Sequence, residues 1–202
     1  MRKTNKELIY KTAFKLFLAR HYEAVSMKDL EKETLLTKGA FYHYVTTKEE
    51  LFCSVIKEYG LDKQRIHNKI DIDKCPSLYD FICEYISGVE KTMKEIQHIL
   101  GDIPLPKVNK AYLSLGLYAG DYYNEFDKLL NEIFQEEIDI WKSVIEKAQK
   151  AGEIQKDTDV VSIAEIFRYI HIGESYIEAV SGGLNTEHLK KQLMCIYNLI
   201  KV

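Results

Sequence analysis

The chain has 202 residues, of which 46% are hydrophobic and 29% are charged, as in ordinary soluble proteins that fold without disulfides or metal ions. No apolar run approaches the ~20 residues of a membrane span, and the first residues lack the apolar core of a signal peptide, so we expect a cytoplasmic protein with no membrane partner. The net charge of −3 argues against a nucleic-acid binder, but residues 1–48 carry ten Lys and Arg against five Asp and Glu. This basic segment can contact a polyanion, unless its charges are only scattered over a solvated surface.

Apolar residues recur with helical spacing from the start of the chain. A first helix has one apolar face, formed by Ile9, Ala13, Leu16 and Phe17. The pattern predicts three further helices, at residues 26–33, 37–45 and 47–59. Ser26 with Asp29, and Thr47 with Glu50, have the spacing of capping boxes, which satisfy the free N–H groups where a helix begins.

The three prolines predict breaks near residues 71–77 and 101–107. Long apolar stripes then predict four more helices, at about residues 77–99, 121–150, 158–180 and 186–200. Because the sequence shows neither strand alternation nor an internal repeat, we predict an all-α protein.

Residues 37–44 have the features of a helix that inserts its N-terminus into the major groove of DNA. The hydroxyl of Thr37 caps the helix, and the first N–H groups and the helix dipole favour a phosphate there. Gly39 costs the helix up to about 1 kcal/mol relative to alanine, which is reasonable if the backbone must approach DNA closely. Phe41 and Tyr44, three residues apart, are expected to face the protein interior.

The side chains on the same helix suit DNA contacts. Lys38 can reach a base edge or a phosphate, and Ala40 offers a small contact to a thymine methyl group. Tyr42 and His43 place hydrogen-bond donors beside the DNA backbone. The alternative is a helical bundle over residues 1–56 in which the tyrosine-rich helix is only part of a core.

The run MKDLEKETLLTKGAFYHYVTTKEELF resembles the DNA-binding signature of the TetR family of transcriptional regulators, and the match covers about residues 5–56. The resemblance implies a three-helix DNA-binding head with a helix-turn-helix at residues 1–46. It also implies a larger helical ligand-binding and dimerisation domain at residues 47–202, and a two-fold dimer. Phosphate contacts are implied for Ser26, Thr37, Tyr42, His43 and Lys48, and base contacts for Lys38, Gly39, Ala40 and sometimes Tyr42.

Three positions depart from the family pattern. Glu31 stands where the family usually has alanine, and Leu35 and His21 stand where it usually or often has glycine. Because a left-handed turn costs a leucine on the order of 1 kcal/mol, we expect a slightly altered turn between the two short helices, with Glu31 directed to solvent. These departures affect the docking angle and the operator preference more than DNA binding itself.

A cavity for an effector is expected among the middle helices. Nine of the fourteen tyrosines follow residue 75, and their rings and hydroxyl tips can line a cavity for an apolar or aromatic small molecule. The candidate residues are Tyr85, His98, Tyr118, Tyr122, Phe126, Trp141, Phe167 and His171, with Phe134 beside them. Core packing is the alternative role for each of these side chains.

The last two helices are the candidates for the dimer interface that the resemblance implies. Their apolar faces could pair with symmetry mates as a four-helix bundle, in which Gly173 would allow a close approach. The candidate interface residues are Ile163, Phe167, Ile170, Leu189, Leu193, Ile196 and Ile200. Alternatively, these stripes close the chain's own core, and different faces of one helix can do both.

We expect neither a metal ion nor a cofactor. The cysteines Cys53, Cys75, Cys83 and Cys195 form no CxxC pair, so packing or surface roles are expected for them. His171 and Glu174 have the i, i+3 spacing of a metal-binding pair, but the partner helices that would complete such a site are lacking. Because no nucleophile elbow, phosphate loop or catalytic carboxylate pair occurs in the sequence, we do not expect an enzyme.

The sequence therefore predicts a ligand-responsive transcriptional regulator. It is expected to be a repressor that binds palindromic operator DNA and is released when a small molecule displaces residues 47–59, which join the head to the sensor. One alternative is an activator of the same fold, because the operator's position relative to the promoter decides between the two. The other is a helical adaptor that binds only protein, and it would bind no DNA even at low salt.

Overall fold

The computed structural model of the chain describes residues 4–101 and 105–202. Within these ranges the only β-type pairing is an isolated antiparallel bridge between Ile154 and Lys201, and all regular elements are helical. The prediction of an all-α fold is confirmed. No helix among the described residues is long and apolar enough to cross a membrane.

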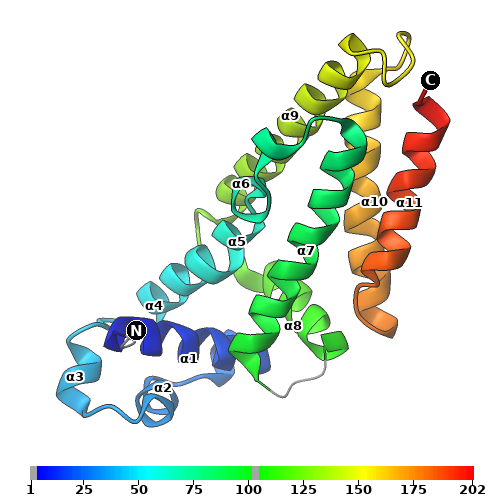
Figure 1. The fold of residues 1–202 in the computed structure, drawn as a ribbon. Helices are drawn as coiled ribbons and strands as arrows, with labels where there is room; N and C mark the ends of the chain where they lie inside the picture. Colours follow the sequence, from blue (N-terminus) through cyan, green and yellow to red (C-terminus); the bar gives the residue numbers. More distant parts are fainter. Residues whose placement is uncertain (1–3, 102–104) are drawn as a thin grey trace.

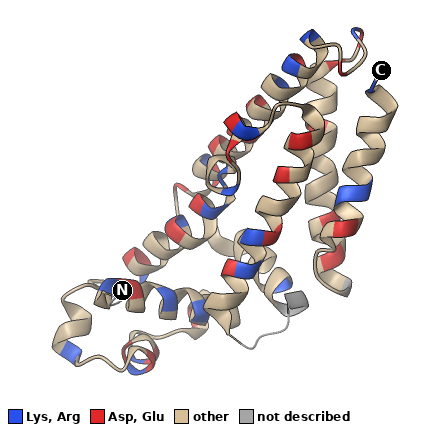
Figure 2. Ribbon diagram, viewed as in Figure 1, with Lys and Arg blue, Asp and Glu red and all other residues tan. Residues whose placement is uncertain are grey.

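The head lies at one end of the molecule (Figure 1). It consists of α1 (Asn5–Ala19), η1 (Tyr22–Ala24), α2 (Met27–Thr34) and α3 (Lys38–Tyr42). Hydroxyl caps begin its three α-helices: Thr4 accepts from the Glu7 N–H, Ser26 from Asp29 and Thr37 from Ala40. Basic residues are spread over all three of these α-helices (Figure 2).

The reading helix α3 is shorter than predicted, because it ends at Tyr42 rather than at residue 45. Phe41 is fully buried, as predicted, but Tyr44 is 44% exposed, so the prediction that it faces the interior is wrong. The chain turns after α3, and Val45 takes the buried position in place of Tyr44.

The rest of the chain forms an elongated bundle that begins with α4 and ends far from the head (Figure 1). Its elements are α4 (Lys48–Val55), the π-helix η2 (Ile56–Leu61), α5 (Asp62–Gln64), α6 (Ile66–Lys69), η3 (Ile72–Lys74), α7 (Leu78–Leu100), α8 (Leu105–Ala119), α9 (Phe126–Lys150), α10 (Val160–Ser181) and α11 (Thr186–Ile200). Helices α7, α9, α10 and α11 run side by side, and α8 lies between this bundle and α1.

Helix α8 was not predicted, and α9 begins at Phe126 rather than near residue 121. Val108, Leu115 and Ala119 are buried with helical spacing along α8. Pro106 falls in its first turn, where a missing N–H breaks no helical hydrogen bond. Pro106 was therefore interpreted only as part of a break, although it lies in the first turn of a helix.

Two apolar cores hold the molecule together. The first joins the head to α4, η2, α8 and the ends of α7 and α9 that face the head. The second lies between α6, α7, α9, α10 and α11, and Trp141 and Phe167 stack in it with ring centroids 4.6 Å apart. Because the first core crosses from head to bundle, the head is packed on the bundle rather than merely tethered to it.

Candidate DNA-binding surface and ligand cavity

Helix α3 presents its polar residues on the surface of the head. Phe41 anchors the helix in the first core, and the Thr37 hydroxyl accepts a hydrogen bond from the Ala40 N–H at 3.3 Å. This leaves Lys38 exposed at the first turn, with Tyr42 and His43 exposed at its end. Predicted phosphate and base contacts therefore lie together on one accessible surface.

Gly39 has no role in the packing of the head. A Cβ atom added at Gly39 would meet no described atom within 4 Å. Glycine in a helix interior costs up to about 1 kcal/mol relative to alanine, and no close packing among the described residues requires it here. The open space at Gly39 is instead suited to close approach by another molecule.

The turn between α2 and α3 has a left-handed backbone conformation, which favours glycine, although the residue there is Leu35. Leu35 has φ 55° and ψ 19°, and it is the only non-glycine residue with positive φ in the part of the chain described. Its side chain is 90% exposed. Glu31 is partly buried rather than directed fully into solvent, while Thr34 is buried and donates its hydroxyl proton to the Glu31 carbonyl at 2.8 Å.

Two predicted phosphate contacts, Ser26 and Lys48, also serve the head's own structure. The Ser26 hydroxyl and N–H both donate to the Asp29 carboxylate, at 2.6 and 2.9 Å, and these hydrogen bonds lower the pKa of that carboxyl. The Lys48 ammonium donates to the Tyr22 carbonyl at 3.0 Å and lies 4.0 Å from the centroid of the Tyr22 ring. Both side chains are therefore held by contacts within the protein.

Aromatic residues join the head to the bundle. The ring centroids of Tyr22 and Tyr122 lie 4.3 Å apart, and the His21 ring stacks on the Tyr118 ring with centroids 4.1 Å apart. The Tyr118 hydroxyl also donates to the Phe17 carbonyl at 2.9 Å. Tyr118 and Tyr122, predicted to line the ligand cavity, instead form this junction, and His21 packs where the family often has glycine.

A largely apolar cavity of about 410 Å³ lies between η2, α7, α8, α9 and α10. This volume is in the range of small-molecule sites. Of the eight residues predicted to line it, Phe126 and His171 do so, and Phe134 lies beside them as expected. Tyr85, Trp141 and Phe167 are instead buried within the second core, and His98 lies on an outer groove beside α1.

One end of the cavity holds a buried polar cluster. The Tyr85 hydroxyl lies 2.5 Å from Oε1 of Glu137 and 2.6 Å from Nδ1 of His171. Because this hydroxyl has one proton and donates it to the carboxylate, His171 donates to the hydroxyl oxygen through Nδ1. Burial, with Lys69 and Arg168 nearby, lowers the pKa of His171 to about 3, so the imidazole is neutral near pH 7.

The two cations of this cluster are held differently. The Lys69 ammonium donates to Gln64 Oε1 at 3.1 Å, and burial lowers its pKa against the attraction of Glu137. Gly88 of α7 lets α6 come close enough to place Lys69 there, because a Cβ at Gly88 would lie 2.8 Å from the Lys69 carbonyl oxygen. Neither Lys69, Glu137 nor Arg168 was predicted, since nothing in the local sequence marks a charge that folding will bury.

Arg168 has unused donors. Its Nε lies 3.9 Å from Oε2 of Glu137, too far for a hydrogen bond, and its guanidinium carbon lies 3.8 Å from the centroid of the Phe134 ring. Among the described residues, Nε and Nη2 of Arg168 have no hydrogen-bond partner, although the side chain is only 6% exposed. Buried donors of this kind are uncommon and call for an explanation.

The apolar faces predicted for the dimer interface are mostly used inside the protomer. Phe167, Leu189, Leu193 and Ile200 are buried in the second core, and Ile163, Ile170 and Ile196 are partly buried against it. A different stripe of α10 is exposed, formed by Ile166, Tyr169, Ile172, Tyr176, Ile177 and Val180, of which Ile172 and Tyr176 also line the cavity. We call this set the α10 stripe, and Gly173 lies beside it with open space around it.

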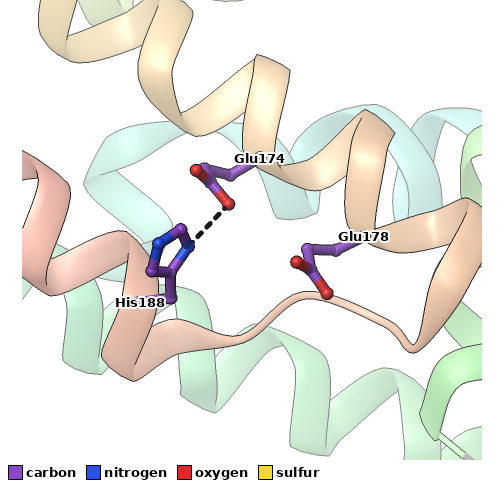
Figure 3. A group of neighbouring side chains, drawn as sticks. All are labelled: Glu174, Glu178 and His188. Carbon is purple, nitrogen blue, oxygen red and sulfur yellow. Dashed lines mark hydrogen bonds and ion pairs between the residues drawn. The ribbon is translucent and has the colours of Figure 1, made fainter.

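A second polar cluster, Glu174, Glu178 and His188, lies between α10 and α11 (Figure 3). One ligand-type atom of each lies within 4.8 Å of the others. Nδ1 of His188 contacts Glu174 at 3.1 Å, and Gln192 Nε2 contacts the other ring nitrogen at 3.1 Å. With both nitrogens engaged, these residues join α10 to α11.

The head matches a known family. Residues 9–55 match the model of bacterial regulatory proteins, tetR family. Over 57 residues the chain is 40% identical to an uncharacterized HTH-type transcriptional regulator, YuxN, of Bacillus subtilis, covering 28% of this chain and 20% of that protein. Over 107 residues it is 28% identical to the transposon Tn10 TetC protein of Escherichia coli, covering 49% of this chain and 54% of that protein. The matches thus span a fifth and about half of these curated relatives.

Solved structures resemble the whole chain in fold. A TetR-family transcriptional regulator from Cytophaga hutchinsonii superimposes with a TM-score of 0.67 at 18% identity, covering 100% of this chain and 99% of that one. The regulator TylP from Streptomyces fradiae gives a TM-score of 0.63 at 18% identity, covering 98% of this chain and 87% of that one. Residues 9–55 therefore match the DNA-binding segment of the tetR family of bacterial regulatory proteins, and the whole chain has the fold of TetR-family regulators of known structure.

Proposed function

We propose that the protein is a ligand-responsive repressor that binds palindromic operator DNA through α3 and is released by a small molecule. The observation that carries this proposal is the exposed surface of α3, where Lys38, Tyr42 and His43 surround a glycine with open space at its Cβ position. Residues 1–46 read DNA, residues 47–202 sense the ligand, and no catalytic step is involved. Such a regulator acts in the cytoplasm, where the chromosome lies.

Two copies of the chain pair through the α10 stripe. Its six apolar side chains are between 39% and 77% exposed, and apolar patches of this kind mark interaction surfaces. A second copy related by a two-fold axis would cover them and would set two reading helices on half-sites roughly 34–36 Å apart, or a multiple of that spacing. This pairing replaces the interface expected from the sequence, because most of those residues are buried in the protomer.

The pairing is tested by Tyr169→Asp and Val180→Asp, which place charges in the α10 stripe. Sedimentation velocity should give a dimer for the parent protein and a monomer for each variant. Leu199→Asp is the control, since Leu199 is 68% exposed on α11 outside the stripe. Variants that remain dimeric would place the interface elsewhere.

The proposed release by a ligand is supported by the position of η2, which forms part of the cavity wall. Ile56, Gly60 and Leu61 line the cavity, and η2 continues directly from α4, which packs on α1 in the head. The Tyr112 hydroxyl also donates to the Gly60 carbonyl at 2.6 Å. A ligand that binds better to one position of η2 would shift α4 and change the distance between the two heads of a dimer.

DNA binding is tested by fluorescence anisotropy with a palindrome from the promoter region of the protein's own gene. Affinity should fall steeply with salt, because phosphates release counterions when Lys and Arg bind them, and it should depend on the sequence of the half-sites. Affinity that depends on neither salt nor sequence would contradict the proposal. Repression rather than activation is then read from reporter expression with the operator in its native position.

A further inference from the structure

The cavity combines an apolar body with a cationic end. Its walls are chiefly aliphatic and aromatic, and include Val89, Ile96, Leu115, Phe126 and Ile133. At the polar end the described lining residues supply two basic side chains, Lys69 and Arg168, against one carboxylate, Glu137, and burial lowers the pKa of Lys69. With His171 neutral, basic side chains outnumber carboxylates in this set, and the donors of Arg168 are the ones left without a partner among the described residues. Buried charges are normally paired, so the cavity lacks an anion that a ligand can supply.

Arg168 offers the matching donors. Nε and Nη2 lie on the same edge of the guanidinium plane, and both lack a hydrogen-bond partner among the described residues. Two parallel N–H donors on one edge match the two oxygens of a carboxylate. Phe134, whose ring the guanidinium covers, helps to hold this plane in place.

We propose that the effector is an amphipathic carboxylic acid, whose apolar body fills the aliphatic part of the cavity and whose carboxylate binds side-on to Nε and Nη2 of Arg168. This inference rests on the proposed function, because it takes the ligand of the cavity to be the effector.

Glu137 does not occupy that position itself. Oε1 of Glu137 accepts the proton of Tyr85, and Oε2 lies 3.9 Å from Nε of Arg168. A bound carboxylate would pair with the guanidinium edge that Glu137 leaves free. A cationic ligand would add a positive charge beside Arg168, so the same cluster disfavours it.

Three probes with the same twelve-carbon chain isolate the contribution of the head group: dodecanoate, dodecanol and dodecyltrimethylammonium. Isothermal titration calorimetry is done on the full chain without DNA. Dodecanoate should bind roughly 10- to 100-fold more tightly than dodecanol, since charge-assisted pairs to arginine are strong when desolvated, and the cation should bind most weakly. Equal or tighter binding of dodecanol would overturn the proposal. Tightest binding of the cation would also overturn it and would make Glu137 the recognition group.

Substitutions of Arg168 test the assigned side chain. Arg168→Met should abolish the preference for dodecanoate over dodecanol, whereas Arg168→Lys should retain a reduced preference, because it keeps the charge but loses the two-donor edge. The control is Arg65→Met, which removes an arginine that pairs with Glu136 outside the cavity and should leave the preference unchanged. If Arg168→Met fails to fold by circular dichroism, Arg168→Lys and the three probes still decide. An unchanged preference in a folded Arg168 variant would overturn the proposal.

The calorimetry separates this inference from the proposed function, because it needs no DNA. A second experiment adds dodecanoate to the protein bound to its palindrome. Loss of anisotropy in the parent protein but not in Arg168→Met supports the acid as effector. Arg168-dependent binding without any effect on DNA affinity would overturn its role as effector. Failure of the protein to bind DNA at all would contradict the repressor proposal while the calorimetric preference still stood.

Discussion

The polar side chains of α3 in the head are exposed to solvent, whereas those at the polar end of the cavity are mostly buried. In the head, Lys38 and His43 are exposed to solvent at the two ends of the short helix α3. Thr37 is the N-cap of this helix. In the cavity, Glu137 and Arg168 have side chains only 10% and 6% exposed. The cavity cluster also joins residues far apart in sequence, since Tyr85 meets a carboxylate 52 positions away and a histidine 86 positions away.

Because of this difference, substitutions in the two regions should affect stability and recognition to different extents. An exposed side chain contributes little to folding, so its removal chiefly affects the partner it contacts. A buried charge contributes to both, because removal of one member leaves the other without a partner in a poorly solvated site. Substitutions in the head should therefore change DNA affinity at nearly constant stability, and substitutions in the cavity cluster should change stability even without a ligand.

The largest effect is expected for Glu137→Gln. This change removes the only carboxylate described at the cavity's polar end and leaves Arg168 and Lys69 without a counter-charge, which should cost about 3–5 kcal/mol of unfolding free energy. Urea denaturation measures the loss. Glu136→Gln is the matched control on the preceding residue, where a partly exposed ion pair with Arg65 contributes less than about 1 kcal/mol. Equal losses from the two variants would mean that the cavity cluster is effectively solvated.

A pH titration should show the burial of His171. Its pKa is about 3 in the folded protein against 6.5 in the unfolded chain, so the unfolded chain binds the extra proton at mildly acidic pH. Stability from this group is complete above about pH 6.5 and declines as the pH falls toward 3, with a loss of about 2 kcal/mol by pH 5. His171→Gln should remove this part of the pH dependence. His43→Gln, on the exposed surface of α3, should leave it in place, and the reverse result would contradict the assignment.

The two regions also differ in what the sequence could reveal. The caps of α2, α3 and α4 lie within three residues of the N–H groups that they satisfy, so the pattern of Ser26 and Asp29 was readable without a fold. The cavity was not readable in this way, because an arginine that will be buried looks like any surface arginine. Trp141 and Phe167 were misassigned for the complementary reason, since a large aromatic side chain suits a core and a cavity equally well.

The candidate interface residues included four that are buried inside the protomer, for a related reason. Helix α10 has apolar residues on two faces, and helical spacing alone does not say which face meets α9 and which meets a partner. The sequence-based choice of Phe167 gave the inner face, whereas Tyr169 and Val180 lie on the outer one. Only the packing of α10 against its neighbours decides between them.

In the head, Lys38→Ala and His43→Ala should each weaken DNA binding by about 1–3 kcal/mol with little change in stability. His43→Ala should weaken binding to all sequences alike, since His43 is expected to meet phosphate. Lys38→Ala should also relax specificity if its ammonium reaches a base edge. Anisotropy against a panel of operator variants measures both effects, and equal losses across the panel would remove the distinction between them.

Gly39→Ala should raise stability and lower DNA affinity at the same time. Alanine stabilises a helix interior by up to about 1 kcal/mol over glycine, and the added Cβ meets no described atom of the protein. The same Cβ would stand where DNA approaches the backbone. Gly116→Ala on α8, where the added Cβ likewise meets nothing described within 4 Å, is the control and should gain stability without loss of DNA affinity. Unchanged affinity in Gly39→Ala would mean that α3 does not approach DNA closely there.

The smallest effect is expected for Leu35→Gly. Leu35 has a left-handed backbone at φ 55°, which costs a leucine on the order of 1 kcal/mol, and its 90% exposed side chain contributes almost no burial in return. Glycine relieves this strain but adds freedom to the unfolded chain, so the net gain should be a few tenths of a kcal/mol and at most about 1 kcal/mol.

The neighbouring residue supplies the control. Leu36→Gly should destabilise the head, because Leu36 is partly buried against the first core. Thermal unfolding of both variants measures the difference. If Leu35→Gly instead lowers the melting temperature, the leucine side chain stabilises the turn through contacts absent from this structure. If Leu35→Gly raises stability but also changes operator preference, the exposed leucine itself contacts DNA. The turn then belongs to the recognition surface together with α3.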